Sequence, residues 1–266
     1  MKRFILTIFT IFMVMGLTGQ VTFAQSSISQ SQFTQLNELN EKAFGAISES
    51  DFAQAELYLT QMLEIAPDNP AILSNRGNVR LSQNKLDEAL ADYNQAVELA
   101  PNVTDPYLNR GIAWEALGIW SKAIADYDRV LELDANDAEA YNNRGNAKSG
   151  LGDWPGVVAD FQKAFELDPD YAFARANYAL ALYQAGDQEE ATGTIRNLVR
   201  KYPQFADMRA ALTAVLWAEG KTGEAESNWV AVVGLDGRYQ DLDWVRNVRR
   251  WPPLMVDALE QFLNLL

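Results

Sequence analysis

Six asparagines recur in a regular pattern along the middle of the chain and could hold an extended polypeptide through hydrogen bonds. A side-chain amide carries a donor and an acceptor, so it can pair with the backbone of a ligand without reading the ligand's side chains. Four of the six lie 34 residues apart, and two follow three residues after a member of that row. The set is Asn75, Asn78, Asn109, Asn143, Asn146 and Asn177. The alternative interpretation is that these amides belong to a repeat consensus and are merely solvated.

Three arginines and three aspartates keep the same spacing, which predicts a structural ion pair in each repeat. They are Arg76, Arg110 and Arg144, each followed 16 residues later by Asp92, Asp126 or Asp160. In the next interval both are lost together, where Tyr178 and Thr194 stand. The alternative, an arginine ladder that binds an anion, is disfavoured because matched acids would neutralise it.

Composition restricts the chemistry that these residues can do. The 266-residue chain contains neither histidine nor cysteine, the commonest metal ligands and nucleophile partners. We find no phosphate-binding glycine loop and no nucleophile elbow, so the sequence predicts no catalytic residue, no metal site, no cofactor and no enzyme. A net charge of −14 disfavours nucleic acid as a partner and suits a basic protein or peptide segment. Solubility alone would explain the charge equally well.

The elements that must position these side chains are helix pairs. The strings Asn-Arg-Gly and Ala-Asp-Tyr (or Ala-Asp-Phe) both recur every 34 residues, and prolines mark the ends of most intervals. Small residues such as Gly77 and Gly111 let two helices approach closely, and the rings of Tyr93 and Tyr127 fill the adjoining space. Asparagine or glycine at residues 84, 118, 152, 186 and 220 provides the left-handed backbone that ends a helix.

This unit resembles the tetratricopeptide repeat family, whose 34-residue repeat is a helix–turn–helix. The resemblance implies an all-α fold, a right-handed superhelical α-solenoid of six helix pairs with a C-terminal capping segment. In such folds the first helices line a concave groove, and the sixth position of each unit, which here holds Asn75, Asn109, Asn143 and Asn177, faces it. The lysine-rich clamp that related domains use for a peptide carboxylate is not found. The units fall at 36–69, 70–103, 104–137, 138–171, 172–205 and 206–239, and the cap at 240–266.

The N-terminus reads as an export signal. Lys2 and Arg3 precede an apolar run from Phe4 to Leu17, and Ala24 offers a cleavage site. We therefore predict a signal peptide over 1–24 and a flexible leader over 25–35, with an uncleaved membrane anchor as the alternative. The Trp-Pro-Pro tail is similar to the C-terminus of some cyanobacterial and chloroplast lumenal members of the family. Together these features indicate the periplasm or the thylakoid lumen, with secretion as a further alternative.

Two functions follow as hypotheses. The first is a non-enzymatic protein–protein interaction scaffold or assembly factor that binds a partner segment in the concave groove. The second is a structural module that self-associates or docks through its outer face or its cap. The cap residues concerned are Trp244, Trp251, Arg246, Arg249 and Arg250.

Overall fold

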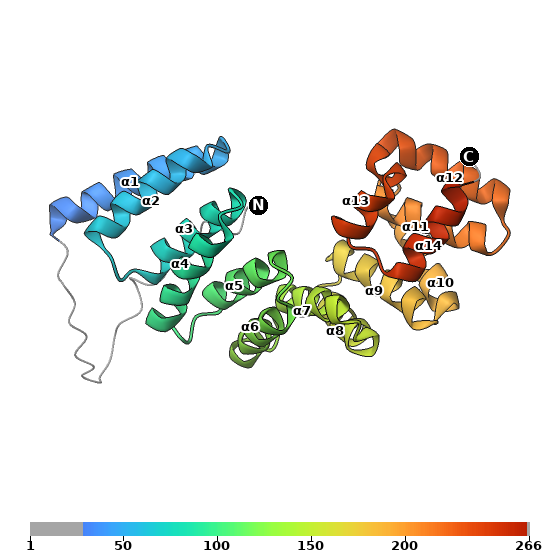
Figure 1. Cartoon of the computed structure of the whole chain (residues 1–266), viewed down its shortest axis with the longest axis horizontal. Helices are drawn as coiled ribbons and strands as arrows, with labels where there is room; N and C mark the ends of the chain where they lie inside the picture. The colour runs from blue at the N-terminus through green and yellow to red at the C-terminus, as the bar shows by residue number, and fades with distance from the viewer. Residues whose placement is uncertain (1–28, 265–266) are drawn as a thin grey trace. The chain divides into compact units, whose positions relative to one another are not determined.

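The computed structural model describes residues 29–264, and every regular element in that range is helical (Figure 1). The described chain divides into two compact units, unit 1 up to Leu133 and unit 2 from Asp134 onward. The predicted fold class, an all-α solenoid of helix pairs, is confirmed. The predicted signal peptide over 1–24 lies outside the described residues. None of the helices described is long and apolar enough to cross a membrane.

Unit 1 consists of three helical hairpins. In each hairpin the two helices pack on one another, and the second helix then packs on the first helix of the next hairpin. The helices are α1 (Gln30–Ser48), α2 (Phe52–Ile65), α3 (Pro70–Ser82), α4 (Leu86–Leu99), α5 (Thr104–Ala116) and α6 (Trp120–Leu133).

Unit 2 contains three more hairpins and the cap. The hairpin helices are α7 (Ala138–Leu151), α8 (Trp154–Leu167), α9 (Ala172–Ala185), α10 (Gln188–Lys201), α11 (Ala206–Ala218) and α12 (Thr222–Leu235). The cap comprises the short 3-10 helix η2 (Gly237–Gln240), α13 (Leu242–Asn247) and α14 (Pro253–Leu263). These cap helices are drawn in red in Figure 1.

The start of α1 differs from the expected flexible leader. The helix begins at Gln30, so residues 30–35 are helical. Ser29 and Gln32 explain the difference, because they form a capping box: the Ser29 hydroxyl accepts from the backbone of Gln32, whose side chain accepts from the backbone of Ser29. Two otherwise unpaired donors at the helix end are thereby satisfied.

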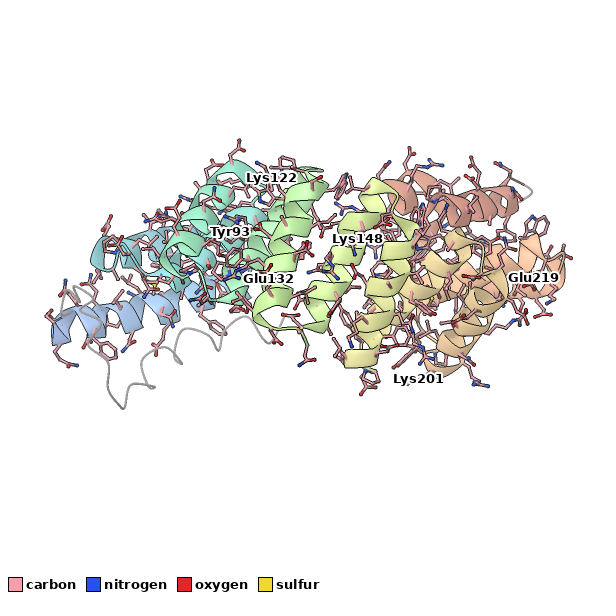
Figure 2. All side chains as sticks on the ribbon, turned by 90° about the horizontal axis from the view of Figure 1, so that it is seen from below. Tyr93, Lys122, Glu132, Lys148, Lys201 and Glu219 are labelled. Atoms are coloured by element: carbon pink, nitrogen blue, oxygen red, sulfur yellow. The ribbon has the colours of Figure 1, made fainter. Side chains whose placement is uncertain are left out.

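Each central hairpin is closed by a glycine facing a ring. A Cβ atom added at Gly77 or Gly111 would lie 2.5 Å from the Cε1 atom of Tyr93 or Tyr127, and one at Gly145 would lie 2.7 Å from Phe161. Tyr93, labelled in Figure 2, and Tyr127 are fully buried. The sequence predicted this small-to-large pairing, and the structure confirms it.

The predicted Arg–Asp pairs are also confirmed, and each joins the two helices of one hairpin. Arg76, Arg110 and Arg144 each donate from Nε and Nη2 to both carboxylate oxygens of their aspartate, at 2.6–2.9 Å. The aspartate side chains are no more than 7% exposed. The hydrogen bonds that Arg110 donates to Asp126 raise the pKa of Arg110. In the last pair Lys148, labelled in Figure 2, adds a second cation at 2.7 Å from Asp160.

The glycine–ring contact gives a prediction. Gly111→Ala should lower the free energy of unfolding by about 1–3 kcal/mol, because the new methyl group displaces a fully buried ring. Chemical denaturation measures the change. Gly193→Ala in α10 is the matched control, since no atom lies within 4 Å of its added Cβ. This control should be neutral or stabilising by about 0.5–1 kcal/mol, and equal losses in both variants would contradict the packing account.

Glu56 joins the first hairpin to the second and gives a pH prediction. It accepts from Arg80 at 2.9 Å and Lys85 at 2.7 Å. Burial alone would raise its pKa, but the bonds from Lys85, Arg80 and Gln83 outweigh burial and lower the pKa to about 2. A carboxylate whose pKa is lowered by folding stabilises above its unfolded pKa, here 4.5, and loses that contribution as the pH falls toward 2. Glu56→Gln should therefore cost about 1 kcal/mol at pH 7 and progressively less between pH 4.5 and 2, in urea titrations. A cost independent of pH would contradict this.

Candidate binding surface

In unit 1 two consecutive first helices lie against one another. In unit 1, α3 packs directly on α5, whereas any contacts between α2 and α4 or between α4 and α6 are weaker. Helices α3 and α5 are therefore closer together than α2 and α4 or α4 and α6, and we take the side of the first helices as the inner side of the stack. We call the surface of α1, α3 and α5 the inner face of unit 1, and that of α7, α9 and α11 the inner face of unit 2.

The three predicted asparagines of unit 1 lie in different environments. Asn75 is half-buried on α3, and no hydrogen bond to its side chain is recorded within residues 29–264. Asn78 accepts a hydrogen bond of 2.7 Å from the hydroxyl of Tyr93, so its oxygen is used in packing. Asn109 on α5 is only 5% exposed. Of the three, Asn75 is thus the amide best placed to receive a ligand.

In unit 2 two of the three predicted asparagines, Asn143 and Asn177, are linked through Asn142, and Asn177 is bonded to the cap. Arg249 donates from Nη2 to Asn177 at 3.0 Å, and Asn177 donates to Asn142 at 3.1 Å. Asn142 in turn donates to Asn143 at 3.2 Å. This series of bonded amides runs from the cap to α7. Asn146 lies at its edge, in the lining of a cavity of about 400 Å³ that Asn177, Asn247, Val248, Arg249 and Arg250 complete.

The cap is fastened to the inner face of unit 2 by one carboxylate. Asp207, on the first turn of α11, is 3% exposed. It accepts from Arg249 Nε at 2.9 Å and Arg249 Nη2 at 2.6 Å, from Trp251 Nε1 at 2.9 Å and from the Tyr239 hydroxyl at 2.7 Å. Three side chains from three parts of the tail therefore meet at a single buried acid.

Helix α14 then covers α9 and α11, packing on both. Leu259 and Phe262 are at most 1% exposed, and the Phe262 ring lies edge-on to Trp217 and Trp229 at centroid distances of 5.5 and 5.4 Å. The backbone N–H of Leu254 donates to Gln184 of α9 at 2.8 Å. Because α9 and α11 are both first helices, the tail covers the part of the inner face of unit 2 that these two helices form.

Electrostatics at Asp207 favour this bound state of the tail. Burial alone would lower the pKa of Arg249, but the charge of Asp207 and the hydrogen bonds to it outweigh burial and raise that pKa. Burial and the neighbouring carboxylate both raise the pKa of Tyr239, so its hydroxyl remains a donor at neutral pH. The arginine is thus charged and the tyrosine protonated at neutral pH.

The structure corrects one of the sequence hypotheses. Trp251 is 3% exposed and Arg249 is bound to Asp207, so these two residues do not form an exposed docking patch. The physical reason is that an indole N–H and a guanidinium gain more from a buried carboxylate than from solvent. The role of Asp207 was not predicted from the sequence, where its one signal is an acid at the second position of a first helix.

Comparisons with known proteins agree with this architecture. A model described as TPR repeat matches residues 77–118 and 116–152, and a model described as Tetratricopeptide repeat matches residues 149–215. The matches run from residue 77 to residue 215, more than half of the chain. The chain belongs to the tetratricopeptide repeat family. A comparison with curated proteins found no match.

Several solved structures share the fold of this chain. A protein from Parabacteroides merdae ATCC 43184 has a TM-score of 0.67 and 21% identity, covering 87% of this chain and 98% of its own. Pseudomonas aeruginosa pilF has a TM-score of 0.68 and 15% identity, covering 78% and 95%. YrrB, described as a TPR protein with an unusual peptide-binding site, has a TM-score of 0.55 and 19% identity, covering 67% and 92%. At these identities the likeness shows the fold alone.

The Asp207 network gives a third prediction. Asp207→Ala leaves the Arg249 guanidinium largely buried without its carboxylate, which should cost roughly 3 kcal/mol of unfolding free energy. The same change should expose the tail to limited proteolysis between residues 240 and 252. The control is Asp243→Ala, because that acid is 85% exposed and, among the residues that the structure describes, forms an ion pair only with Arg246 of the same helix, at 3.5 Å. Equal stability and equal proteolysis of the two variants would contradict the fastening role of Asp207.

Proposed function

We propose that this protein is a non-enzymatic scaffold or assembly factor that holds a segment of a partner protein on the inner face of unit 1. The observation that carries the proposal is the contrast between the two inner faces. In unit 2 the chain's own tail covers α9 and α11, whereas in unit 1 the Phe44 ring of α1 is exposed and Asn75 of α3 is half-buried without a side-chain hydrogen bond in the described residues. The fold and the family, whose members include peptide-binding proteins, support the same function.

The inner face of unit 1 offers apolar as well as polar contacts. Phe44 and Ile47 on α1 are 41% and 36% exposed, and Phe44 is in register with Asn78, 34 residues later. The two hydrogen bonds that the Asn75 amide can make would supply about 1–3 kcal/mol, below the roughly 8 kcal/mol that micromolar binding requires. Covering Phe44 and Ile47 would add about 1.5–3 kcal/mol for each side chain. Most of the binding free energy must therefore come from apolar and charged contacts rather than from the amide.

We place this function in an extracytoplasmic compartment, the periplasm or the thylakoid lumen. The support is the order of charged, apolar and small residues over 1–24.

Self-association is a second candidate function. The side chains of Val230 and Val233 on α12 are 75% and 42% exposed and favour it.

Site-specific photo-crosslinking in the source organism tests the proposal. A photoreactive phenylalanine analogue at Phe44 should yield a covalent adduct with a partner protein, because this ring lies on the inner face. The matched control is Leu57, an apolar residue of the same unit that is 57% exposed on α2. The same adducts from both positions, or adducts from Leu57 alone, would contradict the proposal. An adduct at twice the mass of the chain would favour self-association.

A further inference from the structure

We infer that the inner face of unit 1 recognises a basic partner segment through an arginine side chain received between Asn75 and Asp105. This inference rests on the proposed function and specifies the chemistry of the partner. Its basis is that the protein already binds one arginine in this way, using its own tail in unit 2.

The bound arginine is Arg249. Its Nη2 atom donates both to Asn177 on α9, at 3.0 Å, and to Asp207 on α11, at 2.6 Å, and its Nε atom donates to Asp207 at 2.9 Å. The receptor is thus an amide oxygen on one first helix and a carboxylate on the next. A planar guanidinium with its fork of donors fits such a pair, whereas an ammonium group does not reproduce the two-pronged contact with the carboxylate.

The same pair of receptor residues occurs in unit 1. Asn75 is the sixth residue of α3, as Asn177 is the sixth of α9, and Asp105 is the second residue of α5, as Asp207 is the second of α11. Both members stand 102 residues, three repeats, before their counterparts. Since α3 packs on α5, the fold brings the amide and the carboxylate to one part of the inner face.

In unit 1 the described chain leaves this pair without a ligand. Asn75 and Asp105 are both half-buried, and no side-chain hydrogen bond or ion pair of either is recorded within residues 29–264. By contrast, the hairpin acids Asp92 and Asp126 are each bound by both prongs of an arginine. One residue before Asn75, the buried hydroxyl of Ser74 also has no hydrogen-bond partner in the described part of the chain.

A simpler reason for an acid at residue 105 exists but explains less. Asp105 lies in the first turn of α5, where a negative charge favours the helix dipole. That effect accounts for the acid on α5 and not for Asn75 on α3, which completes the counterpart of the Asn177 and Asp207 pair. The net charge of −14 further favours approach of a basic segment.

Peptide binding to the full chain tests the inference. The probe is a labelled peptide of residues 247–254 with the change R250Q, so that Arg249 is its one arginine, and fluorescence anisotropy gives the dissociation constant. The comparison peptide carries the additional change R249Q. We expect Asp105→Asn to weaken binding of the arginine peptide about tenfold or more and to leave the comparison peptide unaffected. Asn75→Ala should weaken binding of the arginine peptide less than Asp105→Asn does, because the amide is a neutral acceptor and the carboxylate is a charged one.

The control variant is Asp87→Asn, which removes an exposed first-turn acid of α4 in the same unit. It should bind the arginine peptide as the unaltered chain does. Equal affinity of the two peptides, no effect of Asp105→Asn, or no binding of the arginine peptide would each overturn the inference. Adducts from Phe44 would in those cases still support the proposed function, so the two failures are distinguishable.

Discussion

The buried carboxylate of Asp207 is the interaction on which the arrangement of unit 2 depends. It receives donors from Tyr239, Arg249 and Trp251, and through them the tail is held against α9 and α11. Each of these donors would be costly to leave buried without a partner. The hydrogen bonds of the three donors to Asp207 are therefore expected to form together. At the end of a repeat array an apolar face must be covered. Here the tail covers that face by packing on the first helices α9 and α11.

This solution divides the chain into two parts with different roles. In unit 2 the amides of Asn142, Asn143 and Asn177 are hydrogen-bonded to one another and to Arg249, so they serve cohesion. In unit 1 the ring of Phe44 and the amide of Asn75 remain accessible on the inner face. The bound tail is also informative about ligands, because it shows which side chains the repeat can receive at its sixth and second positions.

The sequence predicted the repeating elements well because their causes are local and periodic. The contact of Gly111 with Tyr127 and the pairing of Arg110 with Asp126 recur at fixed spacing, and both are present. The course of the tail could not be predicted, because it depends on the contact of Asp207 with Arg249. These residues are 42 positions apart, and their contact is not repeated along the chain, so no periodic pattern indicates it. The six asparagines were predicted to share one binding face, four as a row and two beside it. Their environments differ because neighbouring side chains such as Tyr93 and Arg249 differ.

Hydrogen exchange of the tail amides in the full chain tests most directly whether the tail fills the inner face of unit 2. Mass spectrometry of peptides from 254–263 should show protection comparable with that of α9 and α11, because the helix is buried against both. Exchange of those amides at the rate of an unstructured peptide, while α9 and α11 remain protected, would contradict the account.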